Sequence, residues 1–150
     1  MKDMNTHQTR ILAALAAAAS LSVVLSGCSL VDELAHKMRS VSYDTAAELA
    51  DEWEGDAPWL PADATGIRIQ ESTMNDTAVI LASSSAELDT ALCAVVPRRS
   101  APAYQMEGAP NAYKADTVFA CGVWAVVASD DGWFGWNPSH PEEQKQSPAS

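Results

Sequence analysis

Two neighbouring stretches in the middle of the chain show the alternation of apolar and polar residues that is typical of β-strands. In residues 65–71, isoleucines alternate with polar side chains, and residues 77–83 form a more continuous apolar run. The sequence Met74-Asn75-Asp76 between them is typical of a turn. Because successive side chains of a strand point to opposite faces, the two stretches predict a β-hairpin.

A second hairpin is predicted near the C-terminal end. Residues 117–128, TVFACGVWAVVA, have the strongest strand character in the chain, and Gly122 marks a bulge or a bend within this one strand. The turn sequence Asp130-Asp131-Gly132 follows, and residues 133–136 are expected as a short return strand.

Helix-start signals occur at two places. The capping boxes Thr45-Ala46-Ala47-Glu48 and Ser84-Ser85-Ala86-Glu87 each precede apolar residues at helical spacing. They predict a helix over residues 45–54, with Trp53 packed inward, and a second helix that leads to Cys93. Residues 97–115 contain three prolines and one glycine and predict a long loop. The expected fold class is α+β, a small antiparallel sheet of four or five strands with helices on one face.

The first 28 residues have the pattern of an export signal. Residues 1–10 carry charges, residues 11–25 carry none, and small residues precede Cys28. The uncharged run of 15 residues is shorter than the ~20 that a membrane-spanning helix needs. If Cys28 is not modified, the segment is an ordinary signal peptide followed by a free cysteine.

The sequence Leu25-Ser26-Gly27-Cys28 resembles the lipobox of bacterial lipoproteins. The resemblance implies that the signal is cut before Cys28, that the thiol of Cys28 receives a diacylglyceryl group (palmitate or a similar acyl chain), and that the protein is anchored on the extracytoplasmic face of the cell membrane. Two acyl chains suffice for stable anchoring, so no protein segment needs to enter the bilayer.

We expect four segments along the chain. A repeat of Leu30, Leu34 and Met38 favours at most a marginal helix in the tether, and prolines and small polar residues favour disorder in the tail. The segments are a signal peptide (1–27), a lipidated tether (28–43), an α+β domain (44–138) and a disordered tail (139–150).

Longer stretches resemble a group of small, mostly uncharacterised lipoproteins of actinobacteria. The resemblance covers roughly residues 53–138 and is carried by WLPADATGIRIQ, TAVILASSSAEL, ALC and VFACGVWAVVASDDGWFGW. It implies an extracytoplasmic location and a small α+β domain, and it offers no catalytic residues to transfer.

Cys93 and Cys121 are expected to form a disulfide, because the compartment implied by the signal is oxidising. The alternatives are two buried free thiols or a metal pair. Two cysteines 28 positions apart with no histidine between them make a poor zinc site. We therefore expect neither a metal nor another cofactor.

The charge of the mature chain excludes nucleic acid as a partner. The signal contains Lys2, Arg10 and Asp3, so the nine basic and twenty acidic residues of the whole chain become seven and nineteen, a formal net charge of −12. Binding to nucleic acid requires a basic face. The same charge repels an anionic membrane surface, so the expected membrane contact is the lipid on Cys28.

The sequence favours a non-enzymatic protein. Its histidines, His7, His36 and His140, all lie outside the predicted core, and the expected lipidation and disulfide use all three cysteines. A hydrolase that uses two carboxylates is the third hypothesis, because acidic residues are plentiful, but no motif selects a pair.

Two groups of residues are candidates for binding. Trp133, Phe134 and Trp136 could stack on sugar rings of the cell wall, although these rings could equally fill the core of a small domain. Arg98 and Arg99 could contact acidic groups of a partner, or be an ordinary exposed pair. The leading hypothesis is a binding or accessory module that acts on another envelope protein, and the rival is a glycan-binding module that uses Trp133 and Trp136.

Overall fold

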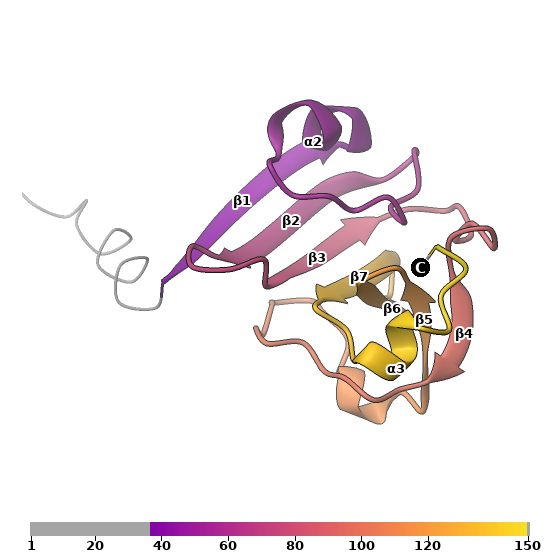
Figure 1. Cartoon of the computed structure of the whole chain (residues 1–150). Coiled ribbons are helices and arrows are strands. Elements are labelled where there is room, and N and C mark those ends of the chain that lie inside the picture. Colours follow the sequence, from indigo (N-terminus) through magenta and orange to yellow (C-terminus); the bar gives the residue numbers. More distant parts are fainter. Residues whose placement is uncertain (1–36, 150) are drawn as a thin grey trace, which may run out of the picture.

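The computed structural model describes residues 37–149, which form one seven-stranded antiparallel sheet with the strand order β1-β2-β3-β7-β6-β5-β4 (Figure 1). The strands are β1 (Met38–Thr45), β2 (Thr65–Ser72), β3 (Ala78–Ser83), β4 (Ala94–Pro97), β5 (Thr117–Cys121), β6 (Trp124–Ala128) and β7 (Gly132–Asn137). The described residues also contain two short α-helices, α2 (Ala46–Glu52) and α3 (Pro141–Gln144), and a 3₁₀ turn, η1 (Ala112–Lys114).

The expectation of a sheet of four or five strands with helices on one face is wrong. The stretch predicted as one strand, residues 117–128, is a hairpin of β5 and β6, because Gly122 adopts a φ of +62° in a two-residue turn between Cys121 and Trp124. Two further strands, β1 and β4, were predicted as part of the tether and as the end of a helix. The structure does confirm the disulfide between Cys93 and Cys121 that was expected for this domain.

The first predicted hairpin and the first predicted helix are confirmed. Strands β2 and β3 pair antiparallel, with Ile69 opposite Ile80. Helix α2 starts after Thr45, whose side chain accepts a hydrogen bond from the backbone N–H of Glu48 at 3.2 Å. Trp53 is buried against the sheet, as the spacing predicted.

The second predicted helix does not form. The side chain of Asp63 accepts hydrogen bonds from the hydroxyls of Ser84 and Ser85 and from the backbone N–H of Ser85. These bonds use the serines that were expected to cap a helix, and they hold residues 84–86 in an extended connection. The bond from the Ser84 hydroxyl contributes most to lowering the pKa of the Asp63 carboxyl; burial opposes it, and the bonds from Ser85 lower the pKa further.

One face of the sheet, the helix face, is covered by α2 and the connection that follows it. Its core contains Ile67, Ile80, Trp124 and Trp133 from the strands, with Trp59 packed across them. The Trp59 ring lies directly over Gly135, where an added Cβ would come within 2.5 Å of the ring. Glycine in β7 therefore lets a whole indole ring reach the sheet surface.

The opposite face, the loop face, is covered by residues 98–115. Its core contains Val79, Val127, Phe134 and Trp136, with the side chains of Tyr104, Met106 and Ala112 from the loop packed against them. The central strands are therefore buried on both faces, which explains the continuous apolar runs in β3 and β6.

Both ends of the predicted domain extend further than the boundaries 44–138. Residues 38–43, expected in the tether, form most of β1, because Val41 and Tyr43 alternate with serines and pack half-buried on the helix face. The tail expected to be disordered contains α3, whose Glu143 is completely buried. The signal peptide and residues 28–36 of the tether lie outside the described residues.

Candidate functional site

The aromatic residues predicted as a binding strand are core residues. Trp133, Phe134 and Trp136 are only 8%, 1% and 0% exposed. As β7 alternates, Trp133 points into the helix face while Phe134 and Trp136 point into the loop face. None of the three rings is available to stack on a sugar, so this surface does not form the predicted glycan site.

The indole N–H groups instead tie the covering segments to the sheet. Trp133 donates to the carbonyl oxygen of Ala86, at 3.0 Å, and Trp136 donates to the hydroxyl of Ser100, at 2.9 Å. Trp124 donates to the carbonyl oxygen of Asp56 at 2.9 Å. Each bond satisfies a buried donor and fixes the position of a connecting segment.

Arg98 of the predicted basic pair organises the long loop. Its guanidinium donates to the carbonyl oxygens of Ala115, at 2.8 Å, and Ser100, at 3.0 Å, and lies 5.7 Å from the centre of the Tyr113 ring. Arg99 is exposed, and its backbone N–H bonds to the carboxylate of Glu143. The two arginines therefore differ in role, and only the side chain of Arg99 faces solvent.

Glu143 is an important residue that the sequence analysis did not single out. Its carboxylate accepts bonds from the backbone N–H groups of Arg99, Ser100 and His140 and from the Ser100 hydroxyl. Burial alone would raise the pKa of this carboxyl, but the four donors outweigh burial and lower it. The sequence His140-Pro141-Glu142-Glu143 carries a signal for this arrangement, since proline at the first helical position and glutamate at the third favour a helix start.

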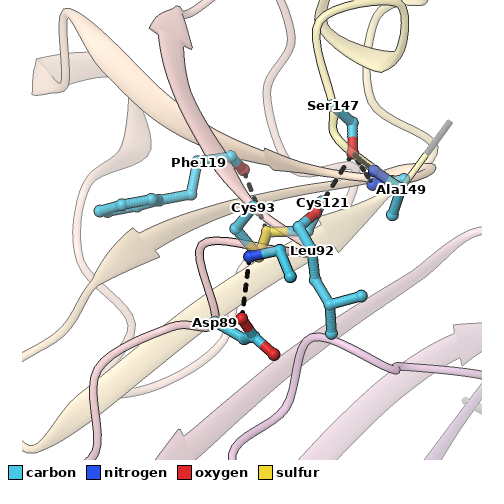
Figure 2. Close-up of a disulfide and its surroundings, with 9 residues drawn as sticks. Asp89, Leu92, Cys93, Phe119, Cys121, Ser147 and Ala149 are labelled. Carbon is cyan, nitrogen blue, oxygen red and sulfur yellow. Dashed lines mark hydrogen bonds between the residues drawn. A yellow bond between two sulfur atoms is a disulfide. The ribbon is translucent and has the colours of Figure 1, made fainter.

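The predicted disulfide between Cys93 and Cys121 is present (Figure 2). It connects the segment before β4 to the end of β5, and both cysteines are buried. The hydroxyl of Ser147, in the C-terminal segment, accepts a bond from the N–H of Gly122 and donates to the carbonyl oxygen of Leu92, next to the two cysteines. Cys28, the predicted lipidation site, lies outside the described residues.

The titratable side chains of the described residues serve mainly as hydrogen-bond partners of the backbone and of neighbouring side chains. Within residues 37–149, no three His, Cys, Asp or Glu side chains come together as a possible metal site. The side chain of His140 caps α3 by accepting the N–H of Glu142. Hydrogen bonds lower the pKa values of the Asp63 and Glu142 carboxyl groups, and that of Glu143 is lowered in spite of burial. The structure places no helix long and apolar enough to cross a membrane in this part of the chain.

An open hollow of about 290 Å³ lies where the end of β3 meets the turn between β6 and β7. Arg68, Leu81, Gly108, Asp130 and Asp131 are among its lining residues. Arg68 already donates to the carbonyl oxygen of Glu107, at 2.8 Å, and both aspartates are exposed. This hollow would leave a small molecule mostly in contact with water.

The most distinctive surface is the outer edge of β1. The carbonyl oxygen of Lys37 accepts the N–H of Thr73, so the odd-numbered residues of β1 direct their backbone groups toward β2. The N–H and C=O groups of Met38, Ser40 and Ser42 consequently point away from the sheet. We call these outward groups the open edge (Figure 1 shows β1 at the border of the sheet).

A side-chain bond marks where the open edge ends. The N–H of Asp44 also points outward, and it donates to the carboxylate of Glu48 at 2.8 Å. The Glu48 carboxylate therefore lies at the border of the sheet, in line with the free groups of β1. A strand that paired with the open edge would reach this carboxylate at one end.

The opposite edge of the sheet is closed by several features. Strand β4 has four residues and ends in Pro97, which has no N–H to donate. The C-terminal segment bonds to Leu92, just before β4, through Ser147. Natural sheets commonly protect edges with short strands, proline and covering loops, and β1 lacks the first two of these devices.

Acidic residues are frequent at the end of β1 and in the α2 segment that follows it. Residues 44–56 contain six acidic residues and no Lys, Arg or His. Asp44, Asp51 and Glu52 are exposed, and Glu48 is half-buried. At the other end of β1, Lys37 is exposed and Arg39 forms an ion pair with Glu71 at 2.6 Å.

Comparison with protein-family models, with curated proteins and with solved structures finds no match to this chain.

Proposed function

We propose that this protein is a non-enzymatic lipoprotein of the cell envelope that binds another envelope protein by accepting an extended segment on the open edge of β1. The lipid on Cys28 would anchor it to the extracytoplasmic face of the membrane. The observation that carries the binding role is the long edge of β1, where the outward backbone groups of Met38, Ser40 and Ser42 have no hydrogen-bond partner among residues 37–149, in contrast to the short, proline-ended edge of β4 on the other side of the sheet. An added strand gains main-chain hydrogen bonds from such an edge without needing a deep pocket.

The position of β1 in the chain supports the same proposal. Nine residues after Cys28 the described structure begins, and the strand that follows is the one with the open edge. A partner held there lies close to the membrane in which this protein is anchored. Binding through the aromatic strand is not part of the proposal, because Trp133 and Trp136 are buried.

Photo-cross-linking in the lipidated full-length protein tests the proposal. A photoreactive residue at Ser42 should form an adduct with a protein of the membrane fraction, whereas the same residue at Asp130 should not. Ser40→Pro removes an outward N–H that is not used in pairing with β2, so it should abolish the adduct and leave the melting temperature within a few degrees of the parent.

The matched variant Ser40→Ala keeps the N–H and should preserve the adduct. An adduct that persists in folded Ser40→Pro would contradict strand addition. Cys28→Ala should move the protein out of the membrane fraction, and continued incorporation of labelled palmitate by this variant would contradict the anchor.

A further inference from the structure

The charges around the open edge indicate which extended segments it would accept. The proposed function concerns only main-chain pairing, which is nearly independent of sequence. Side chains of an added strand, however, would lie beside those of β1 and α2, so they determine specificity.

The carboxylates are concentrated at one end of the edge. Glu48 is held in line with the outward backbone groups by its bond to the N–H of Asp44. Asp44, the next residue of β1 whose backbone points outward, is exposed. No described ion pair neutralises them, since the two ion pairs among residues 37–149 are Arg39 with Glu71 and Lys145 with Glu142.

The other end of the edge has a different character. Lys37 is exposed there, and the Arg39 guanidinium bonds to the Glu71 carboxylate through both Nε and Nη2. Lys37 would repel a basic residue at this end, whereas the charge of Arg39 is neutralised by Glu71. The unpaired charges along the open edge are therefore basic at Lys37 and acidic at Asp44 and Glu48.

Resting on the proposed function, we propose that the partner of β1 is a short extended protein segment with basic residues at the end that lies beside Glu48 and Asp44. Uncharged, strand-forming residues of the segment would pair with Met38, Ser40 and Ser42. Lysine or arginine at the α2 end would form ion pairs with carboxylates that lack a basic partner in this part of the chain.

A set of three peptides tests this inference on the full-length lipidated protein in detergent. Each peptide has the same Thr- and Val-rich strand sequence and ends in two Lys, two Gln or two Glu residues, and binding is measured by fluorescence anisotropy. We expect the Lys peptide to bind roughly tenfold more tightly than the Gln peptide, and the Glu peptide to bind most weakly, because two partly exposed ion pairs have about this combined effect. The difference should shrink as salt is raised.

Two double variants locate the effect. Asp44→Asn with Glu48→Gln should remove most of the preference for the Lys peptide and leave the Gln peptide unchanged, since a glutamine oxygen can still accept the N–H of Asp44. Asp89→Asn with Asp116→Asn removes the same charge beside β4 and β5, at the opposite edge of the sheet, and should preserve the preference. Ser40→Pro should weaken the binding of all three peptides, whereas Ser40→Ala should leave their binding unchanged.

The outcomes separate the two proposals. Equal binding of the three peptides, with loss in Ser40→Pro, would overturn the basic partner and support strand addition. Tight binding of the Lys peptide that is unaffected by Ser40→Pro, or a preference lost equally in both double variants, would overturn the inference as non-specific attraction. Absence of binding by every peptide would overturn the proposed function together with its partner class.

Discussion

At the scale of single residues, Glu143 shows how one buried carboxylate can fix two parts of a chain. It joins the start of α3 to residues 99–100 of the long loop, and Ser100 in turn accepts the indole N–H of Trp136. The chain of bonds runs from the C-terminal helix through the loop into the core of the loop face. A charged group is tolerated there because each of its oxygens has donors.

Glu143→Gln is expected to destabilise the protein by about 2–4 kcal/mol at neutral pH, because an amide nitrogen cannot accept the bonds that one carboxylate oxygen accepts. The wild-type carboxyl has a lowered pKa in the folded protein, so its contribution is present above the ordinary pKa of glutamate, about 4.3, and is lost as pH falls through the lowered folded pKa. The difference in free energy of unfolding between the parent protein and Glu143→Gln should therefore decrease in acid.

Urea unfolding at several pH values measures this effect. Glu142→Gln is the matched control, since Glu142 is exposed and its partner is the exposed Lys145. Its effect should be too small to distinguish the variant from the parent protein, because the ion pair is exposed to solvent. A difference of that size for Glu143→Gln as well would show that the buried contacts contribute little.

At the scale of elements, β1 is both the edge of the sheet and a substantial part of its stability. It pairs with β2 over seven residue pairs, and Val41 and Tyr43 cover the border of the helix-face core. If residues 28–43 were only a tether, residues 38–43 could be removed with little loss of folding stability. Their place in β1 predicts a large loss instead.

A chain of residues 44–149 should be less stable than one of residues 37–149 by about 3 kcal/mol or more, since it loses a strand and exposes Ile67 and Ile69. Thermal and urea unfolding of the two chains provide the comparison. If both chains unfold at the same denaturant concentration, β1 does not belong to the cooperative unit.

The elements that could be predicted from sequence are those with a strong local signal. Alternation in residues 65–71 identified β2, and the capping box at Thr45 identified α2. The local signal failed where a distant residue decides the outcome. Asp63 accepts hydrogen bonds from the serines that resembled a helix cap, so no helix starts there. Residues 94–97 form strand β4 because they pair with β5.

The candidate site was missed for a related reason. Whether a strand lies at an edge depends on the order of all the strands in the sheet. The sequence of β1 itself contains no information on that order. The aromatic residues, by contrast, were conspicuous in the sequence and proved to be core. Alternation along β7 places Phe134 on the face opposite Trp133, so both faces of the strand are buried.

At the scale of the whole molecule, the disulfide holds the β4–β5 end of the sheet together. Cys93→Ala with Cys121→Ala should lower the free energy of unfolding by roughly 3–4 kcal/mol, because the bridge closes a loop with a sequence separation of 28. The fold should persist, since the two faces retain their cores.

Intact-mass measurement and denaturant unfolding check this expectation. The non-reduced protein should be about two mass units lighter than its all-thiol form. Two alkylatable thiols at Cys93 and Cys121 in protein exported by its native host would contradict the bridge. Cys28→Ala serves as the control that leaves the bridge intact.

The start of β1 at Met38 also sets the distance over which this protein can search for a partner. If the proposed lipid on Cys28 is the anchor, the nine peptide units up to Lys37 can span at most about 30 Å, which would confine the open edge to a thin layer above the bilayer. A partner held in the same membrane would share that layer, and its effective concentration would rise without any added contact. A weak, short strand pairing could then be occupied much of the time between two anchored proteins and remain rare between the same proteins released into solution.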